Sequence, residues 1–215
     1  MKSCFKLLLL GLITLGLWSC ASSPSGSPQQ EIPGPHEDQQ LEMGLTDVPQ
    51  EKIIVHTGLD VLEKMRFEPL LGKNVGVVTN HTAVNKKGAH LVDLLHASSD
   101  ISIKAIFAPE HGFRGKEQGG DAIPGSIDPN TGAPIHSLYG AQREPNPDML
   151  KDIDVLLFDI QDVGTRFYTY ISTMGYVLEA GAKYDIPVMI LDRPNPIGRR
   201  INGNVLDEGF ESFVG

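Results

Sequence analysis

The protein has 215 residues, of which 40% are hydrophobic and 21% are charged, and its formal net charge at pH 7 is −9. This length and composition are sufficient for one globular domain with a hydrophobic core. The acidic charge, together with the lack of a long Lys/Arg cluster, excludes nucleic acid as an expected partner. The only cysteines, Cys4 and Cys20, lie near the N-terminus, so no disulfide framework or cysteine metal site is expected in the rest of the chain.

The N-terminus has the features of a bacterial lipoprotein signal peptide. A positively charged start precedes an apolar run, residues 7–18, that is too short to span a bilayer. Leu17-Trp18-Ser19-Cys20 resembles a lipobox, which implies that residues 1–19 are removed and that Cys20 is lipidated. We therefore expect a protein anchored by lipid in the bacterial cell envelope, facing the periplasm or the cell surface. An ordinary secretory peptide or an uncleaved anchor is the alternative.

Residues 20–50 are rich in Ser, Pro, Gly, Gln and Glu, with almost no apolar periodicity. Such a segment cannot bury enough apolar surface to offset the entropy lost on ordering it. It is predicted to be a flexible tether. The folded domain is then expected to occupy residues 51–215.

Short apolar runs and amphipathic segments alternate through this domain. In chain order, the expected elements are a helix at Leu59–Arg66, a strand at Asn74–Thr79, a helix at Gly88–Ala97, strands at Ile101–Phe107 and Ile135–Tyr139, a short helical segment at Met149–Ile153, a strand at Val155–Ile160, a helix at Tyr168–Tyr184 and a strand at Ile186–Leu191. Continuous β-branched runs are typical of parallel strands buried on both faces. The pattern predicts a Rossmann-like α/β domain with a doubly wound, mostly parallel sheet.

Two nucleotide-binding motifs are missing from this pattern. No Gly-x-Gly-x-x-Gly follows a strand and opens a helix, and no Gly-x-x-x-x-Gly-Lys-Ser/Thr is present. The sequence therefore gives no reason to expect a dinucleotide or any other cofactor.

The loop from Phe107 to Gly115 concentrates reactive side chains after an apolar strand. It carries Glu110, His111 and Arg114, together with the glycines Gly112 and Gly115. In an α/β protein the carboxyl end of a strand is where ligands bind. A plain connector with solvated charges is the alternative explanation, since charged loops are common.

Polar side chains follow three further strands in the same way. These groups are Asn80 and His81, then Asp159, Gln161, Asp162 and Arg166, and finally Asp192, Arg193 and Asn195. Because the carboxyl ends of parallel strands share one edge of a sheet, we expect these groups to form a pocket for a hydroxyl-rich ligand that could be anionic. Arg suits bidentate recognition of a carboxylate, and Glu110, beside the apolar Phe107 and Phe113, is a candidate general acid.

Several of these residues also have purely structural explanations. Asp159 could cap a neighbouring loop, Asp192 could hold the turn before the prolines, and His81 could bond to backbone. Tyr168 and Tyr170 are further candidates for substrate binding, although at least one of them could pack in the core. A metal site built from His81, His111, Asp121 and His136 lacks the tight spacing of common metal motifs, so no metal is expected.

Four sequence blocks together resemble the bacterial exo-β-N-acetylmuramidases. They are Val77-Val78-Thr79-Asn80-His81-Thr82, Phe107-Ala108-Pro109-Glu110-His111-Gly112-Phe113-Arg114-Gly115, Phe158-Asp159-Ile160-Gln161-Asp162-Val163-Gly164-Thr165-Arg166-Phe167-Tyr168-Thr169-Tyr170 and Leu191-Asp192-Arg193-Pro194-Asn195-Pro196. The resemblance implies a glycoside hydrolase that removes N-acetylmuramic acid from non-reducing ends of peptidoglycan fragments. It also implies a Rossmann-like N-terminal domain, a smaller C-terminal domain and an active site between them. We therefore expect residues 1–215 to be part of a longer protein.

The resemblance also implies roles for individual residues. Glu110 would be the catalytic acid, and Asp162, Asp159 or Asp192 would position substrate or water, with Asp162 preferred as a second catalytic residue. Arg114, Arg166 or Arg193 would bind the lactyl carboxylate of muramic acid. The acetamido group of the sugar raises the possibility of substrate assistance, which needs one strong acid. A non-catalytic envelope lipoprotein that binds muropeptides is the alternative function.

Overall fold

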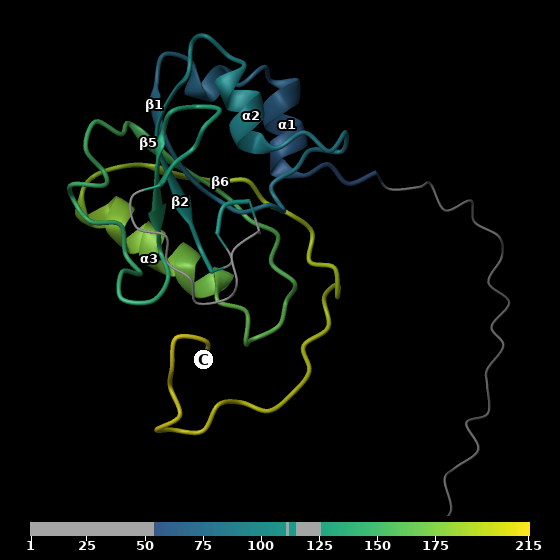
Figure 1. Ribbon diagram of the computed structural model, residues 1–215. Coiled ribbons are helices and arrows are strands. Elements are labelled where there is room, and N and C mark those ends of the chain that lie inside the picture. The colour runs from purple at the N-terminus through teal and green to yellow at the C-terminus, as the bar shows by residue number, and fades with distance from the viewer. Residues whose placement is uncertain (1–53, 111, 115–125) are drawn as a thin grey trace, which may run out of the picture. The chain divides into compact units, whose positions relative to one another are not determined.

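The computed structural model describes residues 54–110, 112–114 and 126–215 (Figure 1). Its elements are α1 (Gly58–Lys64), the 3₁₀ helix η1 (Glu68–Leu70), β1 (Asn74–Thr79), α2 (Leu91–His96), β2 (Ser102–Ala108), β3 (Ser126–Ile127), β4 (Pro134–Ser137), β5 (Val155–Asp159), α3 (Tyr170–Lys183) and β6 (Val188–Ile190). The expected signal peptide, the tether, Cys20, His111 and Asp121 lie outside these residues. No helix within the described ranges is both long and apolar enough to cross a membrane.

The six strands form one sheet in the order β3-β4-β2-β1-β5-β6. All neighbouring pairs are parallel except β3 and β4. From β1 the chain moves outward through β2 to β4, then returns to the other side of β1 with β5 and β6. The strand order therefore reverses between β1 and β5, which is the arrangement of a Rossmann-like sheet, and the predicted fold class is confirmed.

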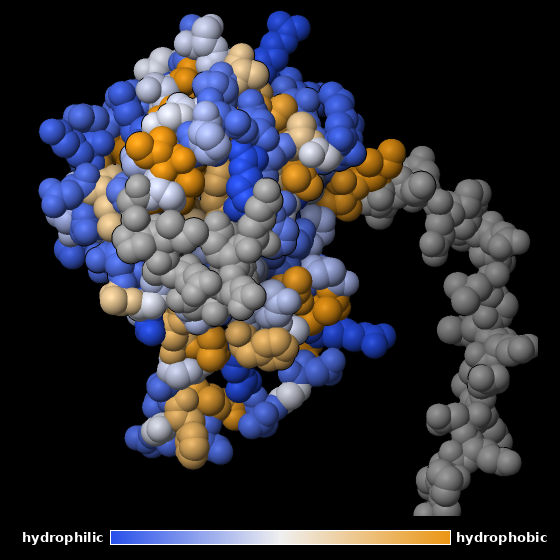
Figure 2. Space-filling model, in the orientation of Figure 1, coloured by the Kyte–Doolittle hydropathy of each residue, from blue (hydrophilic) through white to orange (hydrophobic). Residues whose placement is uncertain are grey.

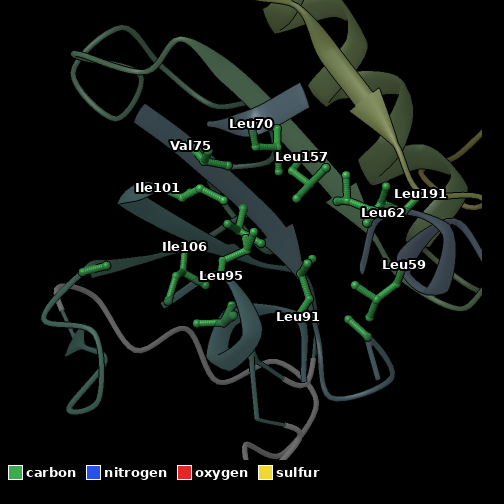
Figure 3. Close-up of a cluster of buried hydrophobic side chains, with 14 of the residues drawn as sticks. Leu59, Leu62, Leu70, Val75, Leu91, Leu95, Ile101, Ile106, Leu157 and Leu191 are labelled. Atoms are coloured by element: carbon green, nitrogen blue, oxygen red, sulfur yellow. The ribbon is translucent and has the colours of Figure 1, made fainter. Parts of the chain in front are cut away.

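Helices cover both faces of this sheet (Figure 1). On one face, leucines of α1 and α2 pack against alternate strand residues such as Val75, Ile106 and Leu157 (Figure 3). On the other face, α3 packs against Val78, Phe107 and the other strand residues whose side chains point away from α1 and α2. Successive side chains of a strand point to opposite faces, so each central strand is apolar throughout, as the sequence indicated.

Gly76 shows how tightly the second face is packed. A Cβ atom at this position would lie 2.8 Å from Ile153 Cδ1, 2.9 Å from Leu156 Cδ2 and 3.1 Å from Phe107 Cε2. A glycine inside a strand often marks such a close approach. Here it allows three large side chains to fill the space over β1.

Several expected boundaries differ from the structure. Helix α1 ends at Lys64, before Arg66, because Arg66 and Phe67 have positive φ angles of 53° and 57°. The expected helical segment at Met149–Ile153 is wrong: these residues form turns, and Asp152 has a φ of 59°. Strand β3 was not expected, since two residues carry no periodicity. Helix α3 begins at Tyr170, two residues later than predicted.

The chain beyond β6 is extended and forms no helix or strand up to Gly215. Its apolar side chains Ile201, Val205 and Phe210 are largely exposed, at 97%, 86% and 71%, and apolar surface is visible at the lower end of the molecule in Figure 2. The segment returns to α3, where the Ser172 hydroxyl donates to the carbonyl oxygen of Phe213 at 2.6 Å. It adds a wall beside the helix without extending the sheet.

His90 joins α2 to the end of β1. Its Nδ1 accepts a hydrogen bond from the Val92 amide at 3.2 Å and caps the helix, while Nε2 lies 2.9 Å from the carbonyl oxygen of Asn80. The imidazole can satisfy both contacts only when neutral, with the proton on Nε2. Burial lowers the pKa of His90 below its ordinary value, and the nearby Arg114 acts in the same direction, whereas the hydrogen bond to Asn80 and the charge of Asp93 oppose it.

We predict that this histidine makes the fold sensitive to mild acid. Because its pKa is lower in the folded protein, the stabilisation is complete above the ordinary histidine pKa of about 6.5 and is lost as pH falls toward the folded value. His90→Gln should reduce the decrease in the free energy of unfolding between pH 7.5 and 5, measured by urea denaturation. His96→Gln is a matched control, because His96 is exposed at the other end of α2. An unchanged pH dependence in His90→Gln would contradict this assignment.

Candidate active site

The carboxyl ends of β1, β2 and β5 meet at one cavity of about 550 Å³. His81 and Thr82 follow β1, Glu110 follows β2, and Gln161 follows β5. The cavity therefore lies where the strand order reverses, the position at which open α/β sheets bind ligands. The predicted convergence of strand ends is realised here for three of the four strands.

A short loop after β1 forms one wall of the cavity. The Oδ1 atom of Asn80 accepts hydrogen bonds from the Thr82 amide at 3.0 Å and from the Thr82 hydroxyl at 2.6 Å. The same hydroxyl oxygen accepts a hydrogen bond from the backbone amide of Gln161 at 2.9 Å. Asn80 is fully buried, and its Nδ2 has no hydrogen-bond partner among the described residues. Asn80 thus shapes the loop from beneath, while Thr82 links the ends of β1 and β5.

Glu110 is held at the opposite side by a turn. The Gly112 amide donates to the carbonyl oxygen of Pro109 at 3.1 Å, and Gly112 has a φ of 68°, which favours glycine. A hydrogen bond to the Glu110 carboxylate raises the pKa of the Tyr139 hydroxyl. Tyr139 follows β4, which lies next to β2 in the sheet. Among the described residues that line the cavity, Glu110 is the only acidic one.

Aromatic side chains form the remaining wall. Phe167, Tyr168 and Tyr170 lie at the start of α3, with ring centroids 5.7 Å apart for the first pair and 5.5 Å for the second. Phe167 is 71% exposed, whereas Tyr170 is buried at 7% and burial raises the pKa of its hydroxyl. Tyr170 therefore packs in the core as well as facing the cavity. A cavity with aromatic walls and a few polar groups suits a sugar ring.

Asp159 and Arg193 form a buried ion pair behind this wall. Arg193 Nε donates to Asp159 Oδ1 at 2.5 Å and Nη2 donates to Oδ2 at 2.9 Å, and neither side chain is more than 6% exposed. Arg193 Nη2 also donates to the carbonyl oxygen of Val84 at 3.2 Å. Burial raises the pKa of Asp159, and the contact with Arg193 opposes that shift. Both residues were expected to bind substrate; in this structure they bind each other and do not line the main cavity.

Arg114 also lies away from the cavity. Its guanidinium lies 4.3 Å from the Phe113 ring centroid and pairs with Asp93 at 3.2 Å and with Asp128 at 3.3 Å. Phe113 in turn packs edge-on against His90. Phe107 and Phe113, expected beside Glu110, are buried in the core and do not line the cavity. Arg114 therefore fastens the Glu110 loop to α2.

The other predicted residues line two neighbouring cavities. Asp162, Asp192 and Arg193 line a cavity of about 210 Å³ that shares Tyr170 with the main one. Arg166 and Asn195 line a cavity of about 840 Å³ that shares Phe167 with it. Asp162 Oδ1 accepts a hydrogen bond from the backbone amide of Gly164 at 2.6 Å, and this bond fixes the turn before α3.

The alternative of a metal site is not supported by the described part of the chain. No three His, Cys, Asp or Glu side chains cluster there in a way that could hold a metal ion. His136 packs against Phe107, and burial lowers the pKa of its imidazole. His111 and Asp121, which that alternative also invoked, are not described.

Four cavity residues were not singled out from the sequence: Thr82, Val163, Phe167 and Thr169. Thr82 and Thr169 carry no signal beyond their proximity to strand ends and a helix start. Phe167 belongs to the aromatic run before α3. An aromatic residue next to a polar turn could have been recognised in the sequence as a candidate for the cavity wall. Its exposure is decided by how the turn at Gly164 directs the chain.

The fold and the cavity define an α/β domain with a cavity of polar and aromatic side chains at the point where strand order reverses. A family model for the N-terminal part of the exo-β-N-acetylmuramidase NamZ matches residues 75–215. The chain belongs to this family. Peptidoglycan β-N-acetylmuramidase NamZ of Bacillus subtilis (strain 168) is 43% identical over 208 residues, which cover 96% of this chain and 46% of that protein.

Two solved structures are similar as well. Both are DUF1343 family proteins from Bacteroides fragilis NCTC 9343. The first is 47% identical to this chain, with a TM-score of 0.67, and the match covers 74% of this chain and 40% of that protein. The second is 40% identical, with a TM-score of 0.63, and the match covers 76% of this chain and 41% of that protein. The chain thus spans less than half the length of each of these relatives.

We predict that removing one partner of the Asp159–Arg193 pair destabilises the fold more than removing both. Arg193→Met leaves a buried, uncompensated carboxylate and should lower the free energy of unfolding by about 3–5 kcal/mol. The double variant Asp159→Leu/Arg193→Met should be less destabilised than Arg193→Met, because no buried charge remains. Urea denaturation measures both. Lys87→Met, which removes a pair with an exposed lysine, is the control and should change little. Equal stability of Arg193→Met and the wild type would refute the prediction.

Proposed function

We propose that this protein is an exo-acting glycoside hydrolase that releases N-acetylmuramic acid from the non-reducing ends of peptidoglycan fragments. The observation that carries the proposal is Glu110, the one acidic side chain among the described residues that line a cavity with polar and aromatic walls at the reversal point of the sheet. The name of the Bacillus subtilis relative supports the substrate class.

Glu110 is assigned the role of general acid. In glycoside hydrolysis an acid protonates the leaving oxygen while charge develops on the sugar ring. The turn closed by Gly112 positions the backbone at Glu110, and the carboxylate lies close enough to Tyr139 to raise the pKa of its hydroxyl. General acid catalysis requires such positioning within hydrogen-bond reach of the leaving group.

A second carboxylate is less well placed. Asp162 lies in the neighbouring small cavity with its Oδ1 occupied by the Gly164 amide, and Asp159 is buried against Arg193. With one acid among the described residues of the main cavity, the acetamido group of the substrate itself is the better candidate for the nucleophile. Gln161 and His81 then serve to orient the sugar, since both line the cavity.

We also propose that the protein is a lipid-anchored envelope protein. The lipobox-like Leu17-Trp18-Ser19-Cys20 supports this location, which would place the enzyme beside the cell wall. Residues 20–50 would act as the tether.

The role of Glu110 predicts a dependence on the leaving group. Glu110→Gln should lower kcat for a muramic acid–glucosamine disaccharide about 10²–10⁴-fold. The loss should be much smaller for 4-nitrophenyl β-N-acetylmuramide, whose leaving group needs little protonation. Glu179→Gln is the control, because Glu179 is exposed on α3 far along from the cavity. Full activity of Glu110→Gln on the disaccharide would sink the assignment, and calorimetric binding by the wild type without turnover would favour a binding protein.

The anchor makes a separate prediction. Cys20→Ala should move the protein from the membrane fraction of the cell to the soluble fraction and abolish incorporation of labelled fatty acid. Cys4→Ala, within the segment expected to be removed, should change neither result. Fatty acid labelling of Cys20→Ala at the wild-type level would rule out this residue as the anchor.

A further inference from the structure

The large cavity beside the active-site cavity has an unusual lining. It measures about 840 Å³ and shares Phe167 with the cavity of Glu110, so the two cavities are neighbours at this residue. Its polar side chains include Thr165, Arg166, Asn195 and Arg200. None of the described residues that line it is acidic. The cavity therefore offers positive charge and hydrogen-bond donors with no internal counterion.

Arg166 differs from the other two arginines considered for carboxylate binding. Arg114 pairs with Asp93 and Asp128, and Arg193 pairs with Asp159. Arg166 makes no ion pair with any carboxylate in the described part of the chain; its Nη2 donates to the carbonyl oxygen of Asn204. A guanidinium has five N–H donors arranged to fit a carboxylate. Most of the N–H donors of Arg166 are therefore still available to a ligand at the cavity wall.

Thr165 supplies a second, independent observation. Its hydroxyl oxygen is buried and has no hydrogen-bond partner among the described residues. Buried polar atoms are nearly always satisfied, so an unsatisfied one in a native site calls for a ligand or a water. Thr165 and Arg166 are adjacent in the chain and line the same cavity. Together they complement an oxygen-rich anion.

We propose that Arg166, with the Thr165 hydroxyl, binds a carboxylate of the ligand whose sugar ring occupies the Glu110 cavity. The inference rests on the proposed function and assigns the residues that determine its substrate class. N-acetylmuramic acid differs from N-acetylglucosamine by a lactyl ether that ends in a carboxylate. That group would extend past Phe167 into the second cavity. A carboxylate of an attached stem peptide has the same chemistry and is the other source.

Selectivity between glycosides tests the proposal. We expect the ratio of kcat/KM for 4-nitrophenyl β-N-acetylmuramide to that for the N-acetylglucosaminide to fall about 10–100-fold in Arg166→Met, mainly through KM. Arg166→Lys should recover only part of the loss, because lysine keeps the charge without the bidentate geometry. Thr165→Val should lower the ratio by a smaller factor. Arg199→Met is the matched control, since Arg199 is exposed and does not line the cavity.

Two further substrates separate the sources of the carboxylate. If the lactyl group is recognised, capping it as a methylamide should reduce wild-type kcat/KM as much as Arg166→Met does. If the stem peptide is recognised, only a muramyl-peptide glycoside should respond to Arg166→Met. An unchanged selectivity ratio in Arg166→Met, with all substrates, would overturn the proposal.

The test remains decisive without turnover. Should the wild type hydrolyse no glycoside, the proposed function fails, and calorimetry with free N-acetylmuramic acid and N-acetylglucosamine still measures discrimination. Preferential binding of the muramic acid that Arg166→Met abolishes would uphold the carboxylate site. Equal binding of the two sugars and of a muramyl peptide by the wild type would reject it.

Discussion

The active-site edge of this sheet depends on one buried ion pair. Asp159 ends β5, Arg193 follows β6, and the same guanidinium reaches the carbonyl oxygen of Val84 in the segment after β1. The Thr79 hydroxyl adds a bond from the end of β1 to the carbonyl oxygen of Asp159 at 3.1 Å. Three chain segments far apart in sequence are thus fixed to each other directly beneath the cavity. A buried charge pair costs desolvation free energy, so its value here lies in holding the strand ends in register.

This constraint explains which polar residues remain available for chemistry. Of the charged groups at the strand ends, Asp159 and Arg193 neutralise each other, and Arg114 is held by Asp93 and Asp128. Glu110 is the acid that the described lining of the main cavity retains, and Arg166 keeps a guanidinium without an acidic partner in the adjoining one. Ion pairing in the interior thus decides which charged side chains are left to face each cavity.

The elements of the fold were predictable to different degrees. Strand β1 has the bounds expected from its β-branched run, and β2, β5 and α3 differ by one or two residues. The prediction failed where local geometry decided: Asp152, with positive φ, replaces a helix by turns, and β3 exists only because β4 offers it a partner. At the site, the residues His81, Glu110 and Gln161 were expected to converge, because parallel strands end at a common edge. Phe167 and Thr82 were not, because exposure and hydroxyl bonding depend on the path of the loops.

The sequence by itself determined the class of fold, the edge on which the polar groups gather and the chemical types present there. Continuous apolar runs, helical spacing and strand-end motifs are local properties, so they can be recognised in a single sequence. Only the tertiary structure decided which charges bind each other and which face a cavity. Arg114, Arg166 and Arg193 look equivalent in sequence, yet within the described part of the chain two are paired with carboxylates and Arg166 is not, since the partners Asp93, Asp128 and Asp159 are brought to the other two by folding. Glu110, the loop residue on which the proposed chemistry depends, likewise obtains its cavity from β1, β5 and α3 rather than from its own loop.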